Sequence, residues 1–300
     1  MANNILIIDG DALMHITYNG SKKTPSYSED GIPNYLIKGF IYSYSKLIKD
    51  LDVADTVFVF DSKEKTFRHE LADGYKKDRR EKDIEMIIQE SIIYDIIDKS
   101  GFKKVIVDGY EGDDVVASIA LEAGKIESGY DNVYIATSDK DIYQILGGKI
   151  KVWNLMKKAI VDDKNYLDFF PVEPKKVVSY LCLVGDSADC VKGVDGIGAV
   201  GAAKLLQHFD DFISIFDNIN EVHHKDIGIS KKAWDELVRI QMSSDPIIEH
   251  NVKMITLVTD VEVSGGFKTD ESLNGFDAIY ESLLDLGFKT TFDRFYGRHK

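Results

Sequence analysis

Short, uninterrupted hydrophobic runs alternate along the chain with longer stretches in which apolar residues recur at helical spacing. The runs predict buried strands at residues 5–8, 56–60, 104–107 and 133–136. The helical spacing predicts helices at residues 35–51, 84–97 and 112–123, and a short one at 141–146. Residues 149–153 and 158–161 are suited to a small hairpin or edge pair. Such strand–helix alternation predicts an α/β fold with a mostly parallel central sheet.

The pattern changes near Pro171, after which it is mainly helical. We therefore expect an α/β domain at residues 1–170 and a helical region at residues 171–300. No stretch rich in proline, glycine or serine separates them, so we expect the two parts to pack as one body.

Composition sets outer bounds on the class of protein. The chain has 300 residues and 44% hydrophobic content, which supports a sizeable core. No apolar run is long enough to span a membrane, and the first residues lack the pattern of a signal peptide. Two cysteines, Cys182 and Cys190, indicate neither a disulfide framework nor a zinc motif. A cytoplasmic location is the expectation.

The net charge of −14, from 51 acids against 37 bases, at first argues against a nucleic-acid partner. Nine of the acids, however, form clusters near the ends of hydrophobic runs. Without those nine the balance is 51 − 9 = 42 acids against 37 bases, which is unremarkable. The positions of the basic residues therefore matter more than the sum of the charges.

The clustered carboxylates are the strongest chemical signal: Asp9, Asp61, Glu111, Asp113, Asp114, Asp139, Asp141, Asp186 and Asp189. Several of them lie at or just past a predicted strand end, where ligands of parallel sheets gather. Carboxylates brought together repel one another unless cations lie among them. Oxygen ligands suit Mg²⁺ or Mn²⁺. The pattern therefore predicts a divalent-metal site for phosphate chemistry.

Each small group of these acids also has a simpler explanation. Helix N-termini favour negative charge, so Asp113–Asp114 and Asp139–Asp141 would serve as caps. Asp186 and Asp189 would share one face of a helix and could simply be solvated. Capping does not explain why all three pairs follow two strand-end aspartates in one chain.

Residues 191–206 contain a tight Gly-Ile-Gly turn followed by small residues and an apolar helical face. This is a helix-hairpin-helix pattern, in which glycines let the backbone approach a phosphate and helix-start amides donate to it. Such contacts hold the DNA backbone without reading its sequence. The candidate residues are Lys192, Gly193, Gly196, Gly198, Gly201 and Lys204. The alternative is a glycine-rich turn between two helices.

Basic residues with aromatic neighbours fill residues 63–82, a composition that suits single-stranded nucleic acid. The candidates for DNA contact are Lys65, Arg68, Tyr75, Lys76, Lys77 and Arg79. Five acids share the segment, so a solvated charged helix is the alternative.

Taken in order, these motifs resemble the flap endonuclease and 5′→3′ exonuclease family, and especially stand-alone bacteriophage enzymes and the 5′-nuclease domain of bacterial DNA polymerase I. The resemblance covers residues 5–260. It rests on Ile-Asp-Gly at Asp9, Phe-Asp at Asp61, Glu-Gly-Asp-Asp at 111–114, Ser-Asp-Lys-Asp at 138–141 and Gly-Asp-Ser-Ala-Asp at 185–189.

The resemblance implies a PIN-like or resolvase-like α/β domain with a helical arch at about residues 62–97. It places Asp9, Asp61, Glu111, Asp113 and Asp114 around a first Mg²⁺ or Mn²⁺ ion, some of them through water. It places Asp141, Asp186 and Asp189 at a second ion, with Asp139 between the two. Tyr75, Lys76 and Arg79 would hold the nucleotide beside the scissile phosphate, and the hairpin would hold duplex DNA, with a K⁺ ion on its carbonyls.

The implied activity is hydrolysis of DNA at 5′ flaps, nicks or free 5′ ends, including RNA primers paired with DNA, in replication or repair. In the two-metal scheme one ion activates a water and both stabilise the transition state, which leaves a 5′-phosphate and a 3′-hydroxyl. Asp9, Asp61, Asp139, Lys76 and Arg79 are the expected catalytic residues. We expect a monomer in a bacterial or phage-infected cell. One departure is Ala199-Val200 after the Gly-Ile-Gly turn, where some phage relatives carry basic residues.

Three other readings remain open at this point. Asp9-Gly10-Asp11 matches the start of a haloacid-dehalogenase-like phosphatase, although Leu13 stands where that family has Thr or Val. A PIN-like ribonuclease shares the acids but is typically shorter and has no helical hairpin. A non-enzymatic junction binder would keep the hairpin and leave the carboxylates unexplained.

Overall fold

The protein is described by a computed structural model that covers residues 2–77, 81–187, 189–243, 245–269, 279 and 281–283. One expected site residue, Arg79, lies outside the described residues. Within these ranges no helix is both long and apolar enough to cross a membrane.

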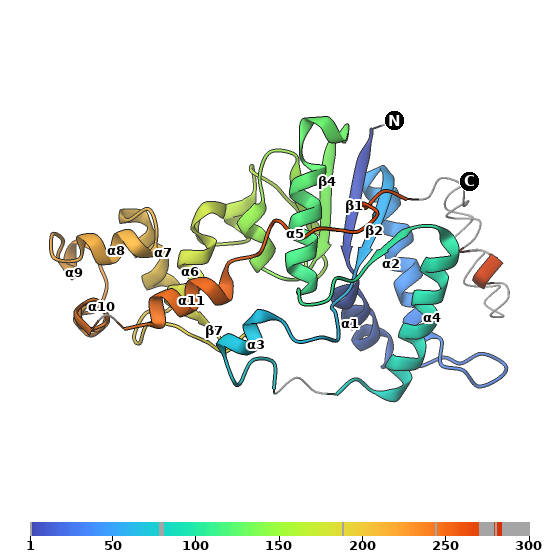
Figure 1. Ribbon diagram of the computed structural model, residues 1–300, viewed down its shortest axis with the longest axis horizontal. Helices are drawn as coiled ribbons and strands as arrows, with labels where there is room; N and C mark the ends of the chain where they lie inside the picture. Colours follow the sequence, from blue (N-terminus) through green and yellow to red (C-terminus); the bar gives the residue numbers. More distant parts are fainter. Residues whose placement is uncertain are drawn as a thin grey trace.

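A six-stranded sheet in the order β3-β2-β1-β4-β5-β6 forms the centre of the first half of the chain (Figure 1). Every pairing is parallel except that of β5 with the edge strand β6, so the expected mostly parallel sheet is confirmed. The strands are β1 (Asn4–Asp9), β2 (Val53–Val59), β3 (Lys103–Val105), β4 (Asn132–Thr137), β5 (Ile150–Asn154) and β6 (Ala159–Val161).

Helices cover both faces of the sheet, because each central strand is hydrophobic on both sides. In β1, Ile5 and Ile7 belong to the apolar cluster that includes the helix α5 (Gly112–Ala123). Leu6 and Ile8 point to the opposite cluster, which includes α1 (Gly10–Ser21), α2 (Tyr35–Leu51) and α4 (Ile84–Ser100). In this three-layer arrangement the carboxyl ends of the parallel strands lie together at one edge of the sheet.

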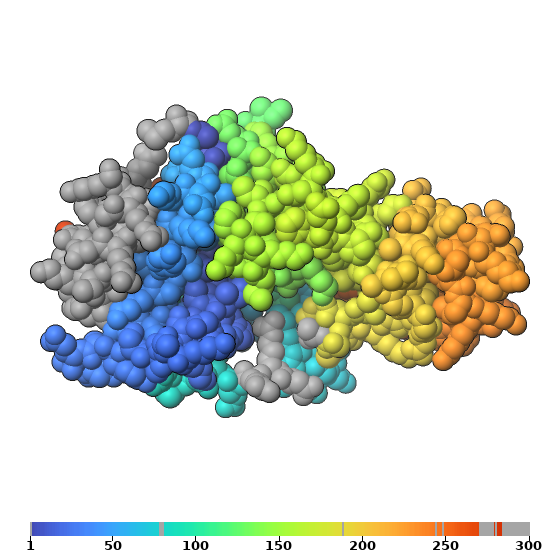
Figure 2. Space-filling view, turned by 180° about the vertical axis from the view of Figure 1, so that it is seen from behind, coloured from blue at the N-terminus to red at the C-terminus, as the bar shows by residue number. Residues whose placement is uncertain are grey.

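The helical region forms a lobe at one end of the elongated molecule, drawn yellow to orange in Figure 2. Its described elements are α6 (Val177–Val184), β7 (Gly185–Asp186), β8 (Val191–Lys192), α7 (Ala199–His208), α8 (Phe212–Asn218), α9 (His224–Ile227), α10 (Lys231–Ser243) and α11 (Ile247–Ile255). The apolar cluster on the α5 face of the sheet continues into this lobe. The two parts therefore share one core.

After α11 the chain returns to the α/β domain as an extended strap, residues 256–269, seen in red across α5 in Figure 1. The backbone N–H of Val261 donates to the Ser118 hydroxyl at 3.0 Å. Further along, Thr269 N–H donates to Asp55 at 3.3 Å, just inside β2. The strap thus connects the helical lobe back to the sheet.

One expectation from the sequence is wrong, and one helix of the structure was not predicted. Asp186 and Asp189 do not share a helix face, because α6 ends at Val184 and Asp186 begins a short antiparallel ladder with β8. A Cβ on Gly193 would lie 2.3 Å from the Val184 carbonyl oxygen, so only glycine permits this close backbone crossing. The helix α1 was not predicted, since it begins with Gly10 and a polar residue directly after a strand.

Candidate active site at the carboxyl ends of the strands

Asp9 is held at the end of β1 by two hydrogen bonds. Its Oδ1 accepts from the Ala12 N–H at 2.9 Å, which caps α1, and its Oδ2 accepts from the Thr137 hydroxyl at 2.7 Å. Thr137 is the last residue of β4, the neighbouring strand. The parallel register of β1 and β4 therefore fixes this carboxylate at their shared edge.

Asp61 follows β2 and is fixed from both its backbone and its side chain. Its Oδ1 accepts from the Gly112 N–H at 2.7 Å, at the start of α5. Its own N–H donates to Asp11 Oδ2 at 2.8 Å. A Cβ on Gly112 would lie 3.0 Å from Asp61 Oδ1, so glycine at this position lets the helix start approach the carboxylate.

Asp113 and Asp141 lie close enough to the other strand-end carboxylates for their charges to interact. Burial raises the pKa of Asp113 well above its ordinary value, and the charges of Asp139, Asp9, Asp61 and Asp141 raise it further. Burial, followed by the charge of Asp139, raises the pKa of Asp141 to about 8. Burial also raises the pKa of Asp9 to about 7. Protons would thus offset part of the mutual repulsion at neutral pH.

Asp186 and Asp189 come from the β7 ladder and the turn after it, and lie beside these carboxylates. Burial, then the charges of Asp186 and Asp139, raise the pKa of Asp189. Asp186 forms an ion pair with Lys140, a residue between Asp139 and Asp141 that the sequence analysis did not single out. Its place inside the Ser-Asp-Lys-Asp motif was the available signal.

Glu111 receives several contacts from residues 66–76, within the segment that was expected to form the arch. The Tyr75 hydroxyl donates to its Oε2 at 2.8 Å, and Lys76 Nζ lies 3.0 Å from its Oε1. The Thr66 hydroxyl donates to Oε1 at 3.4 Å. Lys76 was expected to hold the nucleotide beside the scissile phosphate, and that role stays a prediction. Tyr75 differs from expectation, because its ring is buried and packs edge-on against His69 instead of facing a nucleotide.

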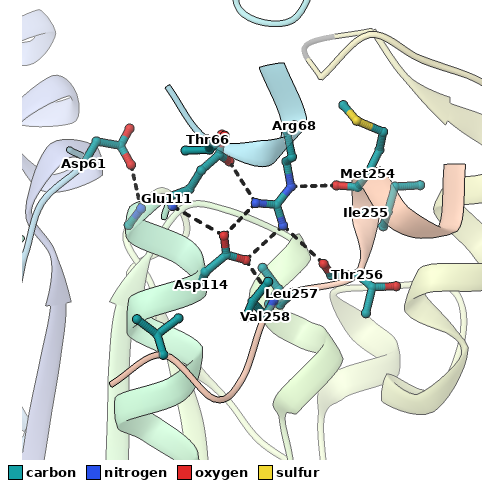
Figure 3. A network of polar contacts seen from close by, with 12 residues as sticks. Asp61, Thr66, Arg68, Glu111, Asp114, Met254, Ile255, Thr256, Leu257 and Val258 are labelled. Carbon is teal, nitrogen blue, oxygen red and sulfur yellow. Dashed lines mark hydrogen bonds and ion pairs between the residues drawn. The ribbon is translucent and has the colours of Figure 1, made fainter. Parts of the chain in front are cut away.

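Arg68 and Asp114 form a buried, bidentate ion pair (Figure 3). The two nitrogen–oxygen distances are 2.6 and 2.9 Å, and the side chains are 3% and 0% exposed. Arg68 also donates to the Met254 and Thr256 carbonyls, and Asp114 accepts from the Val258 N–H at 2.9 Å. This corrects two expectations: Arg68 is not at a DNA-facing surface, and both oxygens of Asp114 are occupied by protein donors.

The remaining carboxylates offer oxygen donors only, which is the donor type that hard cations prefer. Within the described ranges, no group of three or more His, Cys, Asp or Glu side chains is arranged so that it could hold a metal ion. Asp141 Oδ1 is buried without a hydrogen-bond partner. An oxygen-only donor set with an unsatisfied buried oxygen fits Mg²⁺ or Mn²⁺.

The other DNA-binding candidates lie on the arch and the hairpin. On the arch, Lys65 and Lys77 are exposed. On the hairpin, Lys192 is exposed beside Asp195 at 3.7 Å, and Lys204 Nζ donates to the Gly228 carbonyl at 2.9 Å. Three of the hairpin glycines stand at or near the start of α7. They are Gly196, with a positive φ of 85°, Gly198, the N-cap residue, and Gly201.

Asp11 and Lys82 were not predicted as site residues. Asp11 accepts the Asp61 N–H, and Lys82 Nζ lies 3.3 Å from the other Asp11 oxygen. In the sequence, Asp11 stands out only as the second acid of a phosphatase-like motif. Its short distance in sequence from Asp9 was the signal that it lies at the same strand end.

Comparison with known proteins agrees with the fold and the site. Residues 4–170 match the family model of the 5′-3′ exonuclease N-terminal resolvase-like domain, and residues 172–274 match the 5′-3′ exonuclease C-terminal SAM fold. These two models together cover most of the chain. The protein therefore belongs to the 5′-3′ exonuclease family, as its motifs suggested.

Curated relatives include both stand-alone and polymerase-linked members of the family. The chain is 28% identical over 234 residues to a 5′-3′ exonuclease of Buchnera aphidicola, covering 78% of this chain and 80% of that protein. It is 31% identical over 279 residues to the thermostable DNA polymerase I of Thermus thermophilus, covering 93% of this chain. It spans only 32% of that polymerase's length.

Solved structures share the fold at lower sequence identity. The D15 protein of T5, co-crystallised with metal ions, superposes with a TM-score of 0.67 at 18% identity, covering 99% of this chain and 100% of that one. The catalytic core of Rad2 in complex with DNA substrate gives a TM-score of 0.56 at 18% identity, covering 95% and 88%. The haloacid-dehalogenase-like reading has no support from these matches.

Proposed function

We propose that this protein is a structure-specific 5′ nuclease that acts on DNA flaps, nicks and free 5′ ends in replication or repair. The observation that carries the proposal is that Asp9 and Asp61 lie at the ends of the adjacent parallel strands β1 and β2, and that Asp61 accepts from the N–H at the start of α5, where Asp113 lies. Lys76 pairs with Glu111, which directly precedes α5. A cation beside an anionic site at the edge of a sheet suits hydrolysis of a phosphodiester.

The proposed metal ligands are Asp9, Asp61, Glu111, Asp113, Asp139, Asp141, Asp186 and Asp189, with Asp114 reassigned to hold Arg68. Two Mg²⁺ or Mn²⁺ ions, when bound, would supply an activated water and neutralise charge on the phosphate. Hydrogen bonds from the protein orient two of these carboxylates. The Ala12 N–H and the Thr137 hydroxyl donate to the Asp9 oxygens, and the Gly112 N–H donates to Asp61. The products would be a 5′-phosphate and a 3′-hydroxyl.

Lys76 is the proposed electrostatic catalyst. Lys76→Ala should slow single-turnover cleavage by roughly 100- to 1000-fold, by analogy with removal of one oxyanion-hole donor, and should change DNA affinity much less. The matched control is Lys125→Ala, because Lys125 is an exposed lysine that pairs with Glu122 near the C-terminal end of α5 and is not a proposed DNA contact. Equal single-turnover rates for wild type and Lys76→Ala would end this assignment.

The helical lobe is the proposed duplex-binding part, through Lys192, Lys204 and the backbone of residues 193–201. A K⁺ ion on the hairpin carbonyls is part of the proposal. Because contact with the phosphate backbone releases counterions, binding should weaken steeply with salt. Replacing K⁺ by Na⁺ at constant ionic strength should weaken duplex binding further if the ion is specific.

The proposed setting is the cytoplasm of a bacterial or phage-infected cell, with the protein acting as a monomer. Within this proposal, residues 1–170 carry the chemistry and residues 171–300 hold the duplex. Both cysteines carry free thiols, which suits a reducing compartment.

The deciding experiment incubates the protein with Mg²⁺ and a 5′-flap duplex labelled at either end. The control is the double variant Asp139→Asn, Asp141→Asn. Cleavage near the junction of single strand and duplex, lost in the control, is the expected result. RNA and p-nitrophenyl phosphate should be poor substrates. Intact binding without cleavage of flap, nicked or blunt DNA would instead indicate a junction-binding protein.

A further inference from the structure

The C-terminal end of the arch is connected to Asp61 by a chain of polar contacts that starts at Lys82. Lys82 Nζ lies between two carboxylates, 3.3 Å from Asp11 Oδ1 and 2.8 Å from Glu90 Oε2. The other oxygen of Asp11 accepts the Asp61 N–H at 2.8 Å. One side chain, Asp11, therefore contacts both the arch and the backbone of a proposed metal ligand.

The surroundings hold this connection in place. The Tyr94 hydroxyl donates to Glu90 Oε1 at 2.9 Å, and the Tyr94 ring packs edge-on against Phe60, with centroids 4.7 Å apart. Phe60 directly precedes Asp61, and its ring lies where a Cβ on Gly10 would be. These contacts connect α4, Lys82 in the segment before it, and the residues that follow β2 around Asp61.

We propose that Asp11 and Lys82 are positioning residues that couple the seating of the arch to the orientation of Asp61, and so set the cation affinity of the site. The inference rests on the proposed function only in taking Asp61 as a metal ligand. Without the Lys82 ammonium, Asp11 and Glu90 would face each other with no cation from the described part of the chain between them, and repulsion would turn Asp11 away. The Asp61 N–H would then lose its acceptor. Groups that orient a metal ligand in this way typically change affinity by about 10–100-fold when removed.

Charge alone predicts the opposite result, which makes Lys82→Met a sharp test. Lys82 is a cation near an anionic site, so its removal should tighten cation binding if only the summed charge matters. Loss of positioning should weaken binding. The two explanations differ in the sign of the effect, and the measurement does not depend on cleavage.

The experiment is titration of the metal-free protein with Ca²⁺ by calorimetry, with unfolding curves to confirm that each variant is folded. We expect about tenfold weaker binding for Lys82→Met. We expect near-normal binding for Lys82→Arg, which retains a cation between Asp11 and Glu90. The matched control is Lys22→Met: Lys22 pairs with Asp83, the next residue of the same arch end, and has no contact with Asp11.

Unchanged or tighter Ca²⁺ binding by Lys82→Met would overturn the proposal, as would equal weakening by Lys22→Met. A second variant, Asp11→Asn, keeps an acceptor for the Asp61 N–H but loses the ion pair, and should fall between wild type and Asp11→Ala. If wild type bound Ca²⁺ but cleaved no DNA, the proposed function would fail while this coupling could still hold.

Discussion

At the scale of single residues, Arg68 and Asp114 were expected to contact DNA and metal but instead form a structural ion pair. Arg68 and Asp114 have the right residue types for DNA and metal contact, yet each satisfies the other in a buried position. A buried carboxylate with a guanidinium partner is costly to break because the remaining charge has no water to solvate it. The pair therefore anchors the first half of the arch to α5 and to the chain after α11.

Arg68→Met should lower the free energy of unfolding by about 3–5 kcal/mol, measured by urea denaturation, because Asp114 would remain buried and charged. The double variant Arg68→Met, Asp114→Leu should recover part of the loss. Lys253→Met serves as control, since Lys253 pairs with Glu249 at an exposed position and should matter by less than about 1 kcal/mol. A loss no larger than that of the control would refute the assigned role.

At the scale of elements, the hydrophobic pattern predicted the parallel sheet and most of its covering helices. Residues 35–51 and 112–123 form the predicted helices with the same bounds. The pattern could not predict the β7–β8 ladder, because its two-residue strands carry no periodicity and depend on glycines at a backbone crossing. It also could not separate Asp114 from its neighbour Asp113, since partners at residues 68 and 258 are set by tertiary packing alone.

The hairpin glycines should separate into structural and ligand-facing positions. Gly193→Ala should strongly destabilise the protein, because the new Cβ would lie 2.3 Å from the Val184 oxygen. Gly198→Ala meets no atom within 4 Å and should stay within about 1 kcal/mol of wild type.

Under the proposed function, Gly198→Ala should nonetheless weaken duplex binding, because its Cβ would occupy the space through which a phosphate approaches the helix start. Equilibrium binding to duplex DNA, alongside thermal unfolding of the same variants, measures the two effects. Normal duplex affinity for Gly198→Ala would argue against phosphate contact at this turn.

At the scale of the whole molecule, the strand-end carboxylates link stability to pH and to cations. The native pKa of Asp9, about 7, and that of Asp141, about 8, lie above the ordinary carboxyl value. A group whose pKa is raised by folding binds its proton more tightly in the folded state. Its contribution to stability is therefore complete below the pKa that the group has in the unfolded chain, about 4, and is lost as the pH rises toward 7–8.

The metal-free protein should consequently become less stable between pH 5 and pH 8. Ca²⁺ or Mg²⁺ binds the ionised carboxylates, so millimolar cation should raise Tm more at pH 8 than at pH 6, with release of protons on binding. Thermal unfolding with and without Ca²⁺ at each pH measures this. The variant Asp139→Asn, Asp141→Asn should show a smaller cation effect. A cation effect of equal size at both pH values would contradict a cation site among these carboxylates.

The strap after α11 bears on how far this chain can be divided. Residues 1–170 contain all the strands of the main sheet, yet Arg68, Asp114 and Ser118 find partners at residues 254–261. An excised α/β domain would keep its sheet and lose the acceptors and donors that close this buried polar centre. The family models divide the chain into two domains, but the α/β domain depends on residues 254–261 for part of its buried polar contacts. Joining residues 1–170 to a different C-terminal region would require carrying the strap along with them.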